Sequence, residues 1–230
     1  MNDMRTRVTA IRLEMAEAAR SVGRNPEEII LVGVSKRHSA ESVIEAVDAG
    51  VTTLGENYIQ EAVEKIETLG DLGASWHFIG HLQTNKARFA VQYFDLIHTV
   101  DSVKLAREID RRARKINKVQ EILVQINISQ ESSKSGTAAR DALALVREAA
   151  LFENISVRGL MGMPPFFDDP EEARPFFREL AGIRLDIRAA KISNVTMEHL
   201  SMGMSGDFKA AIEEGSTMVR IGTAIFGERQ

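Results

Sequence analysis

The sequence predicts an α/β protein with the architecture of a single (β/α)8 barrel of the TIM type, preceded by an extra N-terminal helix. Eight short segments rich in β-branched residues alternate with segments whose apolar residues recur at helical spacing. No linker rich in Gly, Ser or Pro divides the 230 residues, so we expect one domain over residues 1–230. An open doubly wound sheet is compatible with the same alternation, but the count of eight strands favours the closed barrel.

The first element is predicted to be an amphipathic helix. Its apolar face consists of residues at helical spacing, namely Val8, Ile11, Met15, Ala18 and Val22. Gly23 and the Asn25-Pro26 pair follow. We expect the helix to end there, because glycine is a common C-terminal cap and proline lacks the N–H that would continue the helix.

The predicted strands are short apolar segments at 29–34, 51–54, 76–79, 95–100, 119–128, 155–161, 195–200 and 218–221. Between them, apolar stripes at helical spacing predict helices over 59–69, 105–113 and 173–187. Asp169-Pro170-Glu171-Glu172 precedes the last of these helices. It supplies an N-cap, a proline at the first helical position and an acid at the third.

Strand parity indicates which side chains face the barrel interior. Alternate residues of the first strand share one face, namely Ile30, Val32, Val34 and Lys36. In the last strand, Arg220 shares its face with Met218 and Gly222. If the eighth strand pairs with the first, Lys36 and Arg220 project into the same mouth at the C-terminal end, where barrel enzymes place their chemistry.

Composition excludes several classes of function. The chain has 29 Lys and Arg against 33 Asp and Glu, a net charge of −4, which argues against a protein that coats nucleic acid or anionic lipid. With no cysteine, it has no disulfide, no thiolate nucleophile and no Cys-ligated metal. No apolar run reaches the ~18 residues of a membrane span, and no secretory leader is recognisable. We therefore expect a cytoplasmic protein that binds neither nucleic acid nor membrane.

Lys36 is the first candidate for chemistry. A lysine that ends a buried strand can lose its proton when desolvated and attack a carbonyl as a free amine. A solvated lysine at the start of a loop, before a helix capped by Ser39, is the alternative. Position alone leaves both interpretations open.

Two glycine- and hydroxyl-bearing loops follow the last two strands. They are Ser201-Met202-Gly203-Met204-Ser205-Gly206-Asp207 and the segment after Arg220 that contains Gly222 and Thr223. Barrels frequently hold a phosphate with these two loops, although each alone could be a turn with a helix cap. Together with Lys36 they suit a phosphorylated aldehyde or ketone.

Other polar residues give weaker signals. Asn57 follows the second strand and could be a helix N-cap, a ligand contact, or both. His77, His81 and His199 have no acidic partner at metal-ligand spacing, so we expect structural histidines and no metal. Lys86 and Lys134 lie in loops near the predicted mouth and are expected to be solvated.

Several motifs occur in order along nearly the whole chain: Val34-Ser35-Lys36, Gly55-Glu56-Asn57-Tyr58, His77-Phe78-Ile79-Gly80, Ser133-Lys134-Ser135-Gly136, Arg158-Gly159-Leu160-Met161, Ser201-Met202-Gly203-Met204-Ser205 and the segment from Gly215 to Gly222. In these motifs the sequence resembles the pyridoxal phosphate homeostasis proteins, a family with a barrel like the N-terminal domain of alanine racemase. The loop after Lys36 departs from the family, because Arg37-His38 stands where lysine or threonine is common.

The resemblance implies a binding site for pyridoxal 5′-phosphate. It implies that Lys36 holds the cofactor as an internal aldimine and that Arg220 faces the pyridine nitrogen. The residues that it places around the cofactor are Asn57, Ser201, Gly203, Ser205, Gly222 and Thr223. A guanidinium cannot accept a proton from the ring nitrogen, so the ring would stay unprotonated and carbanion chemistry would be restrained.

Two classes of function remain: an enzyme that uses the cofactor, and a protein that binds the cofactor without turning over a substrate. Racemases on this barrel need an acid or base on each face of the substrate α-carbon and take one from a second C-terminal domain. We expect no such domain after strand eight, and the chain's two tyrosines are Tyr58 and Tyr93. The sequence therefore favours a monomeric, non-catalytic protein that buffers the cofactor, with no catalytic residue. Its partners would be the cofactor and apo-enzymes that need it. The alternatives are an amino-acid racemase and a Schiff-base aldolase, although aldolases commonly carry their lysine on a later strand.

Overall fold

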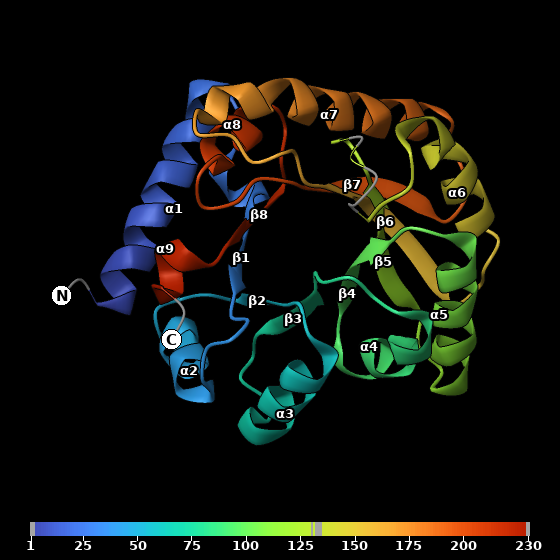
Figure 1. Cartoon of the computed structure of the whole chain (residues 1–230), viewed down its shortest axis with the longest axis horizontal. Helices are drawn as coiled ribbons and strands as arrows, with labels where there is room; N and C mark the ends of the chain where they lie inside the picture. The colour runs from blue at the N-terminus through green and yellow to red at the C-terminus, as the bar shows by residue number, and fades with distance from the viewer. Residues whose placement is uncertain (1–2, 130, 132–134, 229–230) are drawn as a thin grey trace.

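The computed structural model describes residues 3–129, 131 and 135–228. Eight strands pair in parallel in the order β1 to β8, and β8 closes on β1. The helices surround this barrel (Figure 1). The predicted (β/α)8 barrel is therefore confirmed, and the open sheet is excluded.

The strand bounds are β1 (Ile30–Val34), β2 (Thr53–Glu56), β3 (Ser75–Phe78), β4 (Leu96–Val100), β5 (Gln120–Ile126), β6 (Ile155–Gly162), β7 (Val195–Ser201) and β8 (Met218–Ile221). The second strand begins later than predicted, because the Val51 N–H donates to the carbonyl of Ala46 (2.9 Å) and so belongs to the end of the preceding helix. The fifth strand ends earlier, because the Asn127 N–H donates to Thr137 in the following loop (2.8 Å).

The α-helices are α1 (Met4–Ser21), α2 (Ala40–Asp48), α3 (Ile59–Leu69), α4 (Ala87–Tyr93), α5 (Val103–Lys115), α6 (Ala142–Ala149), α7 (Arg174–Ala189), α8 (Phe208–Glu213) and α9 (Thr223–Phe226). The 3₁₀-helices are η1 (Pro26–Glu28), η2 (Thr84–Lys86), η3 (Ala139–Asp141) and η4 (Pro170–Ala173). Asp169 caps η4, with Pro170 in its first turn, so the predicted start of the seventh helix is a 3₁₀ turn that leads into α7. None of the described helices is long and apolar enough to cross a lipid bilayer.

The extra N-terminal helix α1 covers the seam where β8 meets β1, beside α8 and α9 (Figure 1). Arg7 Nε donates to the carbonyl of Ile225 in α9 (2.7 Å). After the helix, Arg24 Nη1 donates to the carbonyl of Ile212 in α8 (2.6 Å). The predicted apolar face is buried except for Val22, which is the exposed C-cap residue. Val22 is therefore wrongly assigned to that face, because the helix ends one residue earlier.

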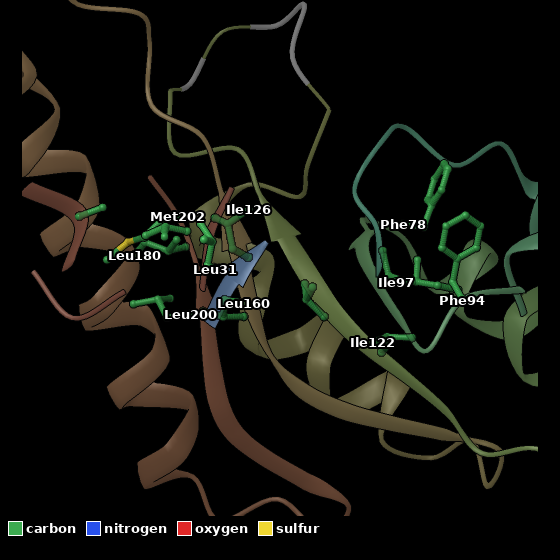
Figure 2. Close-up of a cluster of buried hydrophobic side chains, with 14 of the residues drawn as sticks. Leu31, Phe78, Phe94, Ile97, Ile122, Ile126, Leu160, Leu180, Leu200 and Met202 are labelled. Atoms are coloured by element: carbon green, nitrogen blue, oxygen red, sulfur yellow. The ribbon is translucent and has the colours of Figure 1, made fainter. Parts of the chain in front are cut away.

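The buried apolar side chains form two clusters, one inside the barrel and one between the barrel and its helices. The interior cluster consists of Val32, Leu96, Leu123, Met161 and Met218. The outer cluster contains the alternate residues, and Figure 2 shows Leu31, Leu160, Leu200 and Met202 packed near Leu180 of α7. The strand parity predicted for β1 and β8 is confirmed, since Val32 and Met218 face inward while Leu31 and Val219 face outward.

Gly159 marks the closest approach between two strands. A Cβ atom at this position would lie 1.8 Å from the carbonyl oxygen of His199, its register partner in β7. We expect Gly159→Ala to lower the free energy of unfolding by at least about 3 kcal/mol, at the upper end of the cost of overpacking, because β6 and β7 must separate. Gly182→Ala in α7 meets nothing within 4 Å, and we expect it to be neutral or stabilising by up to ~1 kcal/mol. Urea unfolding of both variants checks this, and equal stabilities would contradict it.

Candidate functional site

A cavity of about 270 Å³ opens at the C-terminal end of the barrel. Its polar lining residues are Lys36, Asn57, Ser205, Asp207, Arg220 and Thr223, with Gly206 and Gly222 between them. The apolar part of the lining includes Val34, Ile79 and Met163. Lys36 and Arg220 thus share one mouth, as strand parity predicts. The volume lies just below the ~300–1,000 Å³ of typical small-molecule pockets.

Lys36 reaches this cavity from a tight turn at the end of β1. The turn is closed by the His38 N–H, which donates to the carbonyl of Ser35 (3.1 Å). The Ser35 N–H in turn donates to the carbonyl of Gly55 in β2 (3.1 Å). Lys36 therefore leaves the sheet where the apolar interior ends, and its half-buried side chain belongs to the cavity wall.

Arg220 is the buried cation of the site. Its Nη1 donates to Ser201 Oγ (2.6 Å) and its Nη2 donates to the carbonyl of Gly162 (3.2 Å). Burial lowers the pKa of Arg220 to about 10, an effect that the nearby Asp207 carboxylate opposes. At neutral pH the guanidinium therefore remains positively charged, and Arg220 is part of the cavity lining.

A chain of hydrogen bonds continues from Arg220 across the barrel interior. Ser201 Oγ lies 3.0 Å from His98 Nδ1, and His98 Nε2 lies 3.0 Å from His77 Nδ1. Ser201 Oγ accepts from Arg220, and the tautomers of His98 and His77 decide which group donates in each of the other two hydrogen bonds.

Both histidines of this chain are neutral. Burial lowers the pKa of His77 to about 4. Burial, together with the neighbouring His77 and Arg220, lowers the pKa of His98 well below its usual value. Arg220 is therefore the positive charge of the chain, and the histidines serve as hydrogen-bonding dipoles rather than as acids.

The loop between β7 and α8 turns sharply beside the cavity. Gly203 has a φ of 92°, and a Cβ there would lie 2.6 Å from the Cβ of Ala211, so this position requires glycine. The Met204 N–H donates to Asp207 Oδ1 (2.6 Å), which closes the turn. Among the described residues, the N–H groups of Ser205 and Gly206 have no acceptor and remain available to a ligand.

The structure separates the eight residues predicted to bind a ligand into two groups. Those that line the cavity are Lys36, Asn57, Ser205, Arg220, Gly222 and Thr223. Ser201 and Gly203 are fully buried and are not part of the lining. Ser201 holds Arg220 instead, and the carbonyl of Gly203 accepts the backbone N–H of Arg220 (3.0 Å). These two residues support the site from behind.

Asn57 is not the helix cap that the sequence allows. Tyr58 occupies the N-cap position of α3 and makes no side-chain cap hydrogen bond. The buried Oδ1 of Asn57 has no hydrogen-bond partner in the described part of the chain. Since Asn57 lines the cavity, this atom is an acceptor offered to a ligand.

The other histidines and lysines considered from the sequence do not line the main cavity within the described residues. His81 is exposed at an adjoining cavity and lies 3.2 Å from Ser135 Oγ. His199 is half-buried in β7. Lys86 ends η2 away from the main cavity, and Lys134 lies outside the described residues. No group of metal-ligating side chains occurs within residues 3–129, 131 and 135–228.

Sequence reasoning missed the loop between β6 and η4. Met163, Pro165, Phe166 and Phe167 line one side of the cavity, and Phe166 is 87% exposed. The signal was an apolar Met-Pro-Pro-Phe-Phe segment directly after a strand, at the end where a barrel opens. His98 was also missed, because it lies within an otherwise apolar strand and no nearby residue marks it.

Comparison with known proteins shows which family the sequence belongs to. The sequence matches the family described as alanine racemase, N-terminal domain, over residues 8–230. It is 42% identical to the pyridoxal phosphate homeostasis protein of Escherichia coli K12 over 235 residues, covering 100% of this chain and 98% of that protein. It is 41% identical over 224 residues to the protein of the same name from Aquifex aeolicus, covering 97% of each.

Solved structures of related proteins superimpose on the barrel along most of its length. PipY of Synechococcus elongatus, determined with PLP bound, superimposes with a TM-score of 0.81 and 34% identity, covering 93% of this chain and 100% of that one. An alanine racemase of Clostridium difficile superimposes with a TM-score of 0.72 and 17% identity, covering 99% of this chain and 57% of that one. The latter likeness concerns the fold alone.

The neutral histidines predict a loss of stability in acid. As the pH falls below 6.5, the unfolded chain binds a proton at His77 that the folded protein does not bind until about pH 4. The free energy of unfolding therefore falls over this window, by about 3 kcal/mol at pH 4 for His77 alone. Urea unfolding at pH 7 and pH 4 measures the loss. We expect a smaller loss in His77→Gln and an unchanged loss in the control His81→Gln; identical losses in all three proteins would contradict the assignment.

Proposed function

Because the chain belongs to the pyridoxal phosphate homeostasis protein family, we propose that it binds pyridoxal 5′-phosphate and holds it in reserve without turning over a substrate. One observation carries the proposal: Lys36 and Arg220, which come from opposite ends of the chain, line the same cavity. The relatives' shared name and the PLP bound to PipY support it. We further propose that the protein acts as a cytoplasmic monomer that supplies apo-enzymes.

The donors around the cavity fit this cofactor. Pyridoxal 5′-phosphate presents an aldehyde, a pyridine nitrogen and a phosphate. The Lys36 amine suits the aldehyde, and the Arg220 guanidinium suits the nitrogen as a hydrogen-bond donor. The N–H groups of Ser205 and Gly206, and the hydroxyl of Thr223 in the same lining, suit the phosphate. Asn57 Oδ1, buried and without a described partner, remains available to a donor on the ligand.

When bound, the cofactor supplies an aldehyde that condenses with primary amines and a ring that draws electrons from the resulting carbon–nitrogen bond. Lys36 provides the amine that anchors it. Arg220 keeps its own proton, because its pKa stays near 10 even when buried. It can donate to the ring nitrogen but cannot protonate it at neutral pH, and this limits the electron-withdrawing power of the ring.

The cavity also has few groups that could act as an opposed acid and base. Its ionisable lining residues, within the described part of the chain, are Lys36, Asp207 and Arg220. Asp207 accepts the Met204 N–H, and Arg220 is held by Ser201. Neither tyrosine helps, since Tyr58 is exposed outside the lining and Tyr93 donates to Glu67. Two-base racemisation needs a proton carrier on each face of the substrate, so this lining favours the carrier.

The proposal predicts where the cofactor attaches. Borohydride reduction of the protein loaded with pyridoxal 5′-phosphate is expected to fix a phosphopyridoxyl group on Lys36, because among the described lysines it is the one that lines the cavity. Peptide mapping by mass spectrometry locates the label. Lys36→Arg is expected to abolish it, and Lys86→Arg, near the mouth but outside this cavity, is the matched control. A label found chiefly on Lys86 or Lys134 would refute the assignment.

The proposal also predicts the absence of turnover. The loaded protein is incubated with a panel of L- and D-amino acids in deuterated water, and deuterium at each α-carbon is followed by NMR. We expect at most a stoichiometric change in the cofactor spectrum, because the ionisable residues of the described lining other than Lys36 are Asp207 and Arg220, which are held by Met204 and Ser201. Catalytic deuteration of any amino acid that disappears in Lys36→Arg would overturn the carrier proposal in favour of a racemase.

A further inference from the structure

A buried ionic cluster lies directly behind the turn that carries Lys36. The Lys65 ammonium in α3 donates to three acceptors, each at 2.7 Å: the carbonyl of Ser35, Oε1 of Glu56 and Oε1 of Glu61. The Lys65 side chain is 8% exposed and the Glu56 side chain is fully buried. All three ammonium hydrogens are therefore used, and one of them is given to the backbone next to Lys36.

A contribution to the stability of the fold does not explain why these charged residues are buried. Burying a lysine and a carboxylate costs about as much desolvation energy as their attraction returns, so apolar residues commonly do as well. Burial accordingly raises the pKa of Glu56 despite Lys65. Oε2 of Glu56 has no hydrogen-bond partner among the described residues. The cluster is therefore unfavourable to bury, and it contacts the backbone at Ser35, next to Lys36.

The cluster holds the first residue of the Lys36 turn by its side chain and by its backbone. Ser35 Oγ donates to Oε1 of Glu56 (2.8 Å). The Ser35 carbonyl accepts both from Lys65 (2.7 Å) and from the His38 N–H that closes the turn (3.1 Å). Ser35 can thus neither rotate nor shift without breaking bonds to a buried ion pair.

The other side of the turn is held in a strained conformation. Arg37 has a φ of 61°, a left-handed geometry that is unfavourable for a residue with a side chain. The Arg37 N–H donates to Oε1 of Glu61, the carboxylate that also binds Lys65. The Arg37 guanidinium lies over the ring of Tyr58, 5.7 Å from its centroid. Strain of this kind persists only where surrounding contacts fix it.

We propose that Lys65, Glu56 and Glu61 are positioning residues, which clamp the backbone on both sides of Lys36 and so present its amine to the cavity. This inference rests on the proposed function, because it assigns the clamp to the lysine that binds the cofactor. The clamp comes from one segment, since β2 supplies Glu56 and α3 supplies the other two residues. The same segment carries Asn57 into the cavity.

The first test separates positioning from simple loss of stability. Lys65→Met leaves Glu56 buried without its cationic partner, so the double variant Glu56→Gln/Lys65→Met, which replaces both ionisable groups, is compared with it. Ile109→Ala is the control, because this fully buried α5 residue contributes to the outer core and not to the clamp. The cavity left by this substitution is expected to destabilise the fold about as much as the clamp variants do.

Two measurements are made on each protein. Amide hydrogen exchange of the cofactor-free protein reports on the peptide covering residues 35–38. The rate at which borohydride traps pyridoxal 5′-phosphate on Lys36, followed as a function of pH, reports on presentation of the amine. We expect the clamp variants to exchange at least tenfold faster in this peptide and to lose about tenfold to a hundredfold in trapping rate, as for a misplaced reacting group. Ile109→Ala is expected to change neither.

A milder pair covers the outcome in which the Lys65 variants fail to fold. Glu61 is half-buried, so its variants are expected to fold. Glu61→Gln retains an oxygen that accepts from Arg37 and Lys65 and is expected to keep most of the trapping rate. Glu61→Leu removes that acceptor and is expected to lose it.

The outcomes are distinguishable. Wild-type exchange and trapping in the double variant, or losses in Ile109→Ala that match those of the clamp variants, would overturn the clamp. A wild-type protein that never incorporates the cofactor on Lys36 would instead refute the proposed function. The exchange measurement on cofactor-free protein would still decide whether the cluster holds the turn.

Discussion

Parallel pairing between β8 and β1 is the interaction on which the whole site depends. It sets Arg220 beside Val32 in register and closes the barrel. Lys36 continues the inward face of β1 beyond Val32, so closure brings the amine and the guanidinium to one mouth although they lie near opposite ends of the chain. The helix α1 packs over this seam and is tied to the elements after β7 and β8 by hydrogen bonds from Arg7 and Arg24.

The barrel interior changes character along its axis. An apolar cluster around Val32, Leu123 and Met218 fills part of it. Nearer the mouth, a buried guanidinium must be solvated by the protein itself. Ser201 does this directly, because its Oγ accepts from Arg220, and the neutral His98 lies within hydrogen-bonding distance of the same hydroxyl. The guanidinium of Arg220 is thus supported by Ser201 and His98, which lie outside the cavity lining.

Rigidity at the mouth comes from a different source. The turn that carries Lys36 includes a left-handed Arg37, and neither that conformation nor a buried Lys65 is favourable alone. Glu61 stabilises both features, because its carboxylate accepts from the Arg37 N–H and from the Lys65 ammonium. A carrier gains from such a turn, since an anchoring amine that is already in place loses little conformational freedom when a ligand binds. Apart from Lys36, the ionisable residues of the described lining are Asp207 and Arg220, and hydrogen bonds tie them to Met204 and Ser201.

The sequence by itself determined the barrel, its strands and the inward direction of Lys36 and Arg220, because alternation along a strand is a local property. It also indicated the loops around Ser205 and Thr223, whose glycines and hydroxyls are adjacent in the chain. Tertiary structure decided the rest. Ser201 was predicted to surround the phosphate, yet its hydroxyl is directed to Arg220 and to His98, which lies 103 positions away. The partners of a buried polar group depend on which strands the closed barrel brings together, and no local pattern records that distance.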